Sequence, residues 1–185
     1  MPTIDHLLAE MAIRQLHVKY ADAVWRKDFV AFGDCFAEDC EWRIGGMTLR
    51  GRDDIVRTFE GIIGHFNRVL LTFRTPILEV GQGTASARTY VNEMTARKDG
   101  GPSTALGLYF ERFVDQGDQW RFKWRLWQTL YRGNADLSGV FFDNTDFGPP
   151  PRMPDWDTPP PHYPGFPGQS DRGAPGSGGS SGQSQ

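Results

Sequence analysis

Arg125 is the residue of this chain whose setting most strongly suggests chemistry. Its neighbours along the chain are large and apolar, so the guanidinium cannot easily reach water; they are Phe122, Trp124, Leu126 and Trp127. A buried guanidinium is costly unless an acid pairs with it or an anionic ligand meets it. Two interpretations therefore stay open. Arg125 forms a structural ion pair with Glu93, Asp22 or Glu111, or it stabilises negative charge on a bound molecule.

Tyr20 and Tyr90 are candidates for moving a proton. A phenol ordinarily ionises with a pKa of about 10, and a neighbouring arginine lowers that value toward the range useful for acid–base catalysis. The alternative for each is a core tyrosine whose hydroxyl bonds to the backbone. Asp22 is a candidate carboxylate, with a solvated helix charge as its alternative. His65 is a further candidate at the end of an expected helix.

Aromatic residues make up 13% of the chain, with six Trp and thirteen Phe. Such side chains supply large, flat apolar area. Trp25, Trp42 and Trp127 are therefore candidates for stacking on an aromatic ligand. Ordinary core packing is the alternative for all three.

The segments that position these candidates begin with helices. Asp5 is expected to cap a first helix, whose apolar residues recur near the helical period. Asp28 is expected to cap a second helix over residues 29–36. Asp53 or Asp54 opens a third, which ends near residues 64–67.

The remaining elements are expected to be strands. Gly45 and Gly46 join strands 40–44 and 47–49. A long strand over residues 68–80 contains Pro76, which implies a bulge or an edge position. Three further strands are joined by tight turns into an antiparallel meander; they span residues 84–97, 104–114 and 119–132. Helices followed by a meander indicate an α+β fold, in which a curved antiparallel sheet wraps around the N-terminal helices as a cone with an open mouth.

Composition divides the chain into three parts. Residues 1–135 form the expected folded domain. Ten of the thirteen prolines lie from Pro149 onward, and aromatic residues punctuate them, so residues 136–167 are expected to form an arm that packs on a surface. That surface is the domain itself, the mouth of its pocket or a neighbouring subunit. Residues 168–185 are rich in Gly, Ser and Gln, and we expect them to be disordered.

Charge and cysteine content exclude several classes of function. The formal net charge is −3 with interspersed signs, so neither nucleic acid nor an anionic membrane is expected as a partner. The two cysteines and four histidines show no metal-binding spacing. No signal peptide or membrane span is apparent, and two free thiols suit a reducing compartment. We expect a cytoplasmic protein without metal.

Four short motifs, in this order, carry a resemblance to a known family. They are Tyr20 with Asp28-Phe29, the run from Phe36 to Trp42, the run from Leu49 to Ile55, and Pro76-Ile77-Leu78-Glu79-Val80. Over roughly residues 5–133 the chain resembles the SnoaL-like branch of the nuclear transport factor 2-like superfamily. That branch includes scytalone dehydratase, bile acid 7α-dehydratase, hexachlorocyclohexane dehydrochlorinase and polyketide cyclases. The resemblance implies an α+β barrel around a small-molecule pocket, no cofactor, and a homotrimer or homodimer.

The resemblance also shows what is missing. The related enzymes commonly use an Asp on the first helix and a His on the first long strand. Those positions correspond to Trp25 and Leu71 in this chain. The usual Asp–His base therefore cannot be carried over, so the chemistry is either different or absent.

The same resemblance places a set of pocket residues. Trp42 and Arg125 match pocket positions of the dehydrochlorinase-like members, and strand alternation adds Trp127 and Thr129 to the inner face. Three residues of the strand over 84–97 are expected to share the inner face: Arg88, Tyr90 and Asn92. Arg74 is expected to be aimed inward by a bulge at Pro76.

Together these residues predict a cofactor-independent lyase for a small hydroxylated aromatic molecule. In it Arg125, with Arg74 or Arg88, stabilises a phenolate or enolate, and Tyr20 or Tyr90 moves the proton. Deformylation of a lignin-type diarylpropane diol to a stilbene is one such reaction, and dehydration is another. The alternatives are a polyketide or steroid cyclase or isomerase, and a binding protein that holds an apolar ligand without turnover.

Overall fold

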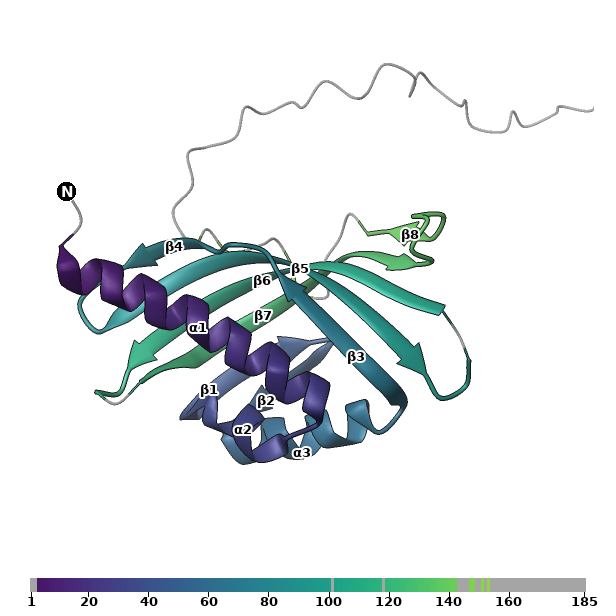
Figure 1. Ribbon diagram of the computed structural model, residues 1–185, viewed down its shortest axis with the longest axis horizontal. Coiled ribbons are helices and arrows are strands. Elements are labelled where there is room, and N and C mark those ends of the chain that lie inside the picture. Colours follow the sequence, from purple (N-terminus) through teal and green to yellow (C-terminus); the bar gives the residue numbers. More distant parts are fainter. Residues whose placement is uncertain are drawn as a thin grey trace, which may run out of the picture. The chain divides into compact units, whose positions relative to one another are not determined.

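The computed structural model describes residues 3–100, 102–117, 119–142, 147–148, 151 and 153 (Figure 1). All of them belong to one of the chain's two compact units, Met1–Asp155. The expected tail over residues 168–185 lies outside the described residues, as does most of the arm over 136–167. The boundaries of domain, arm and tail stay predictions.

Three helices form at the expected places, with different caps. Helix α1 (Ile4–Arg26) begins after Thr3, whose hydroxyl accepts the backbone N–H of His6 at 3.2 Å, so the expectation of an Asp5 cap is wrong. Asp5 instead lies in the first turn, where negative charge suits the helix dipole. Helix α2 (Phe29–Asp34) is capped by Asp28 as predicted. Helix α3 (Arg52–Ile63) begins after Gly51 without a side-chain cap.

The strands follow the predicted order. A hairpin of β1 (Phe36–Ile44) and β2 (Met47–Arg50) turns at Gly45 and Gly46, both with positive φ. The expected long strand over residues 68–80 is two strands, β3 (Phe66–Phe73) and β4 (Ile77–Val80). Pro76 lies in the break, because proline has no N–H for the ladder. The meander is confirmed and consists of β5 (Thr84–Arg97), β6 (Pro102–Asp115) and β7 (Trp120–Gly133), to which the short β8 (Val140–Phe141) adds.

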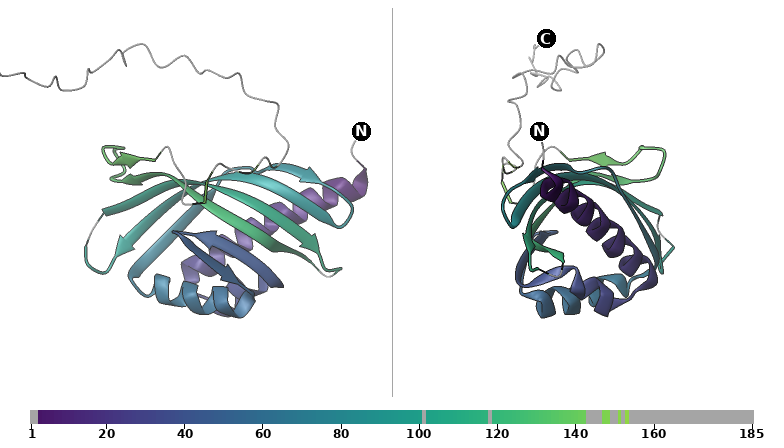
Figure 2. Two further views of the ribbon diagram at one scale, coloured as in Figure 1. Left: turned by 180° about the vertical axis from the view of Figure 1, so that it is seen from behind. Right: turned by 60° about the vertical axis from the view of Figure 1, so that its left-hand side comes forward.

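These strands form one curved sheet that does not close. The order is β2-β1-β7-β6-β5-β3, with β4 paired to β5 and β8 to β7. Only the β1–β7 pair is parallel among the described strands. The sheet curls around α1, which lies along its concave side, while α2 and α3 lie beyond one end of that helix (Figures 1 and 2). The mixed α+β fold with a curved antiparallel sheet is therefore confirmed, as an open sheet rather than a closed barrel.

The main core fills the space between α1 and the sheet. Aromatic rings dominate it, and Phe32 and Phe59 stack with ring centroids 4.0 Å apart. A second apolar cluster contains Leu108, Phe110 and Leu126, and Phe147 and Met153 pack against them. These two residues of the expected arm thus pack on their own domain. No helix within the described ranges is long and apolar enough to cross a membrane.

Candidate active site

A largely enclosed cavity of about 220 Å³ lies between α1, α3 and the sheet. Most of its wall is apolar. Seven lining residues carry polar groups: Tyr20, Trp42, Glu93, Tyr109, Trp127, Thr129 and Arg132. An apolar hollow with a few convergent polar groups is the usual form of a small-molecule site.

Five residues expected at the pocket from the sequence do line this cavity. They are Tyr20, Trp42, Leu71, Trp127 and Thr129. The indole N–H of Trp127 donates to the Thr129 hydroxyl at 2.9 Å. That indole lies directly over Gly107, where an added Cβ would come within 1.9 Å of the ring. The Trp127 ring therefore occupies the space that a side chain at position 107 would need.

Arg125 does not line the cavity. It is fully buried and faces Glu111, its direct cross-strand partner on β6. Its Nε donates to Oε1 of Glu111 at 3.0 Å, and its Nη2 lies 3.0 Å from the same oxygen. The structural interpretation of Arg125, with Glu111 as its partner, is the arrangement observed, and direct contact with a ligand in the cavity is not.

The same carboxylate of Glu111 has two further partners. Its Oε2 accepts from the Thr89 hydroxyl at 2.8 Å and lies 2.7 Å from Nε2 of His17. Although burial raises the pKa of Glu111, the charges of His17 and Arg125 outweigh it and hold that pKa below its usual value. Glu111 is therefore an ionised acceptor at the centre of the network.

Both ring nitrogens of His17 face oxygen atoms in this network. Its Nδ1 lies 3.1 Å from the backbone oxygen of Ile13, and its Nε2 lies 2.7 Å from Oε2 of Glu111. The Glu111 carboxylate therefore lies between His17 and the Arg125 guanidinium.

Two tyrosines separate the charge of the Arg125 guanidinium from the cavity. The Arg125 guanidinium carbon lies 4.4 Å from the ring centroid of Tyr20 and 3.8 Å from that of Tyr109. Burial raises the pKa of Tyr20, and the Arg125 charge partly opposes that rise. Burial also raises the pKa of Tyr109 well above its usual value. Both phenols are therefore protonated; their hydroxyls hydrogen-bond each other, and the Arg125 charge lies beside them.

Glu93 is the lining residue that the sequence considered only as a partner for Arg125. It lies on β5, directly opposite Leu71 of β3. Burial raises the pKa of Glu93, and the charge of Arg132 lowers it only in part. A carboxyl group whose pKa is above its usual value thus lies opposite Leu71, the position that the resemblance was expected to match to the related enzymes' histidine.

The face of β5 was predicted wrongly. The buried residues of this strand are Ala85, Ala87, Thr89 and Val91, so the odd-numbered positions, Glu93 among them, face inward. Arg88, Tyr90 and Asn92 therefore lie on the other face, outside the described lining, and Tyr90 is 44% exposed. The run of small or β-branched residues at odd positions was the signal that could have identified Glu93.

Four further candidates also lie outside the described lining. Trp25 is 46% exposed, with the Arg68 guanidinium 5.8 Å from its ring, and Val24 takes its place at the cavity. Asp22 is exposed and pairs with Arg26. Arg74 and His65 are exposed, each at the end of an element. The turn of helix α1 places Asp22 and Trp25 at the surface. The break before Pro76 does the same for Arg74, and His65 follows the end of α3.

No group of three or more His, Cys, Asp or Glu side chains in the described residues is arranged to hold a metal ion. Larger depressions exist at the surface, including one of about 710 Å³ beside the start of α1, but that depression is more open to solvent than the cavity. The cavity is therefore the candidate active site.

Comparison with known proteins agrees with this fold. The model of the SnoaL-like domain matches residues 5–125. No curated protein sequence matches the chain significantly.

Three solved structures illustrate the likeness of fold. A Novosphingobium aromaticivorans protein, provisionally called a scytalone dehydratase, is 24% identical over 75% of this chain and 96% of its own, with a TM-score of 0.67. A second protein of that organism, provisionally called an aromatic ring hydroxylase, is 27% identical over 72% and 94%, with a TM-score of 0.64. The type 3 hexachlorocyclohexane dehydrochlorinase LinA of Novosphingobium barchaimii is 17% identical over 75% and 97%, with a TM-score of 0.63.

Proposed function

The chain belongs to the SnoaL-like domain family, and within it we propose a lyase that acts on a small hydroxylated aromatic ketone without a cofactor. The observation that carries the proposal is the pairing, across one apolar cavity, of a carboxyl group with two tyrosine hydroxyls. Glu93 supplies the base, and Tyr20 and Tyr109 supply the hydrogen-bond donors. This pairing replaces the missing Asp–His base.

The tyrosines stabilise negative charge on a substrate oxygen. Donors fixed in a dry site, with positive charge behind them, favour an oxyanion without needing to reorganise. The Arg125 guanidinium, which lies against both tyrosine rings, supplies that field. Arg125 is then a positioning residue that acts through Tyr20 and Tyr109, rather than a group that touches the substrate.

Two lyase reactions use these groups in the same way. In dehydration, the Glu93 carboxylate takes a proton from the carbon beside the ketone, and an enolate forms at the tyrosines. The carbon–oxygen bond to the hydroxyl then breaks, and the departing hydroxide takes the proton from Glu93 as water. In the carbon–carbon reaction, Glu93 takes the hydroxyl proton, formaldehyde leaves, and the resulting enolate carbon recovers the proton from Glu93.

The cavity volume favours a substrate with a single ring. A cavity of about 150 Å³ is enough to hold benzene. The 220 Å³ found here accommodates one ring with a short side chain. A lignin-type diarylpropane diol has two aryl rings, so we propose a single-ring compound as the substrate in its place.

One probe distinguishes the two reactions. β-Hydroxypropiophenone carries one ring, a ketone and a hydroxyl group. Dehydration converts it to phenyl vinyl ketone and water, whereas carbon–carbon cleavage converts it to acetophenone and formaldehyde. Chromatography with mass spectrometry identifies which pair forms.

Replacing Glu93 with Gln tests the base. Gln keeps the size of the side chain but cannot take a proton, so kcat is expected to fall by about 10²–10⁴-fold. The wild-type rate is expected to rise with pH through the raised pKa of Glu93, above its ordinary 4.5. The matched control is Glu60→Gln, on the exposed side of α3, which should retain the rate. Equal rates for Glu93→Gln and wild type, or no product from the wild type, would contradict the proposal and favour a protein that only binds.

A further inference from the structure

The mouth of the cavity carries a charged side chain, that of Arg132. Of the described residues that line the cavity, those that are exposed mark where it meets solvent: Gly45, Met47 and Arg132. The first two lie at the turn of the β1–β2 hairpin, whereas Arg132 lies near the end of β7. Among these three residues Arg132 alone bears a charge, so a ligand that enters here passes a guanidinium.

A bulge on β7 turns Arg132 towards the cavity. Thr129 and Tyr131 face consecutive residues of β6, so Leu130 between them is an extra residue in the ladder. Without this bulge, strand alternation would place Arg132 on the face opposite to that of Thr129. With it, Thr129 and Arg132 both line the cavity, while Leu130 packs with the second apolar cluster. The register of the sheet therefore builds Arg132 into the rim.

Arg132 and Glu93 stand in one row of the sheet. Ala105 of β6 faces Glu93 of β5 on one side and Arg132 of β7 on the other, and all three line the cavity. Two strand spacings, about 9.5 Å, separate the backbones of the two charged residues. The charge of Arg132 lowers the pKa of Glu93 in opposition to burial, so its field reaches that carboxyl group.

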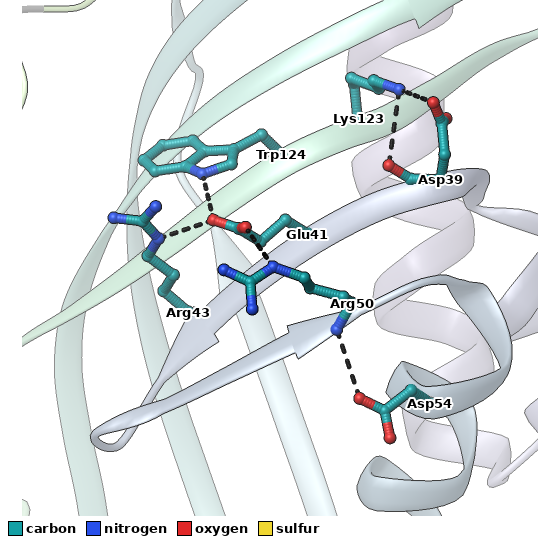
Figure 3. Close-up of polar contacts among 7 residues, drawn as sticks. All are labelled: Asp39, Glu41, Arg43, Arg50, Asp54, Lys123 and Trp124. Atoms are coloured by element: carbon teal, nitrogen blue, oxygen red, sulfur yellow. Dashed lines mark hydrogen bonds and ion pairs between the residues drawn. The ribbon is translucent and has the colours of Figure 1, made fainter.

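Other arginines of the sheet are already engaged by carboxylates. On the outer face, Arg43 and Arg50 both donate to Glu41 (Figure 3). In the core, Arg125 is held by the buried carboxylate described above. The side chain of Arg132, in contrast, forms no ion pair or hydrogen bond with any residue that the structure describes. An exposed guanidinium is hydrated, and its donors are available to an acceptor on a ligand.

We propose that Arg132 is a specificity-determining residue that binds a carboxylate on the ring of the substrate, opposite the acyl group. Its planar fork of donors matches the two oxygens of a carboxylate, and one guanidinium balances one negative charge. Tyr20 and Tyr109 are 1% and 5% exposed, so the ketone binds deep in the cavity and the carboxylate reaches the mouth. Repulsion by Glu93 is weaker, because that residue lies two strands away along the row. The inference rests on the proposed function, and it narrows the substrate to an acidic aryl ketone.

Calorimetric titration of the full chain with a matched pair of probes tests this contact. 4-Acetylbenzoate and 4-acetylbenzamide have nearly the same shape, but only the first is charged. The wild type is expected to bind the benzoate about three- to tenfold more tightly, as is typical of a charged contact that is open to water. That preference should shrink as salt is added, because salt screens exposed charges.

Substitutions of Arg132 separate its charge from its packing. Arg132→Met keeps a long unbranched side chain without the charge, so it should abolish the preference while binding the benzamide nearly as well as the wild type does. Arg132→Lys keeps the charge but not the fork, so it should retain part of the preference. The control Arg50→Met removes the same charge from the outer face, where that side chain is 73% exposed, and should keep the preference.

Several outcomes would overturn the inference. Equal affinity of the wild type for the two probes, a full preference in Arg132→Met, or failure of both probes to bind would each exclude a carboxylate site at Arg132. These results are independent of turnover. Loss of the preference in Arg132→Met, in a protein that does not convert β-hydroxypropiophenone, would support the carboxylate site and contradict only the proposed lyase. Conversion of that uncharged compound by a wild type without the preference would contradict only the carboxylate site.

Discussion

Two inward-facing glutamates, Glu111 fully buried and Glu93 partly so, show how surroundings assign different roles to one side chain. Burial raises the pKa of both Glu93 and Glu111. Glu111 has His17, Arg125 and Thr89 around it, and the two charges lower its pKa overall. Glu93 has only the charge of Arg132 to oppose burial, so its pKa stays raised. Glu111 is thus a fixed counter-ion, whereas Glu93 is suited to exchanging a proton.

The raised pKa of Glu93 predicts that this residue reduces stability at neutral pH. In the unfolded chain Glu93 ionises with a pKa of about 4.3, whereas in the folded protein it ionises at a higher pH. Stability is therefore lost as pH rises from the unfolded value through the folded one, because the unfolded chain releases the proton more readily. Glu93→Gln should be more stable than the wild type at neutral pH and equal to it below about pH 4.3.

Urea unfolding at a series of pH values measures this difference. Glu60→Gln provides the baseline, since that side chain is exposed. A gain for Glu93→Gln that persists unchanged at low pH would mean that packing rather than ionisation causes it.

At the scale of the strands, alternation predicts which residues share a face but not which face is buried. On β5 we expected the even-numbered residues, which include Arg88 and Tyr90, to face the pocket. The odd-numbered residues are the buried ones instead. The sequence does contain the deciding feature, since small apolar residues such as Ala85 and Ala87 are typical of a packed core. Glu93 was therefore considered only as a partner for Arg125, and Thr89 was not considered at all.

Bulges limit the same kind of prediction on β7. Arg112 faces Trp124 while Phe113 faces Phe122, so Lys123 is an extra residue in the ladder. This shift turns both Phe122 and Arg125 inward. Burial of Arg125 follows from its apolar neighbours in the sequence, but the choice of Glu111 among three candidate acids depends on cross-strand register. Register follows from the assembled sheet, which the local sequence does not specify.

Gly107 provides a prediction at this scale. A methyl group there would lie within 1.9 Å of the Trp127 ring, so Gly107→Ala must displace that indole. We expect a loss of about 1–3 kcal/mol in the free energy of unfolding, as is typical of overpacked sites. The displaced indole should also lose its hydrogen bond to Thr129. The signal of the Trp127 indole N–H in a nuclear magnetic resonance spectrum of nitrogen-15-labelled protein measures this loss.

The control for Gly107→Ala is Gly61→Ala, because no atom lies within 4 Å of an added Cβ at that helical site. Alanine favours helix, so this variant should be at least as stable as the wild type. An unmoved Trp127 signal in Gly107→Ala would show that the glycine does not set the indole's position.

At the scale of the whole domain, the sheet has two apolar sides with different coverings. Its concave side packs on α1 and encloses the cavity. Elsewhere, Leu108, Phe110 and Leu126 are covered by Phe147 and Met153, which come from the proline-rich segment. Composition alone predicted that this segment packs on a surface, because it contains aromatic residues among the prolines. Which of three surfaces it uses depended on contacts between residues far apart in the chain.

Replacing Met153 with Asp tests what this covering does. A charge at a site only 7% exposed should release the segment and uncover the apolar residues beneath it. Burial of one methionine contributes about 1.5–3 kcal/mol, so the domain itself should stay folded. Uncovered apolar patches promote association, so a higher mass by light scattering and stronger binding of an apolar dye are expected.

The control is Met11→Asp on α1, where the side chain is 67% exposed and covers little. The wild type is expected to be a homodimer or homotrimer, which gives the reference mass. An unchanged mass and dye signal for Met153→Asp would mean that the segment does not prevent association through Leu108, Phe110 and Leu126.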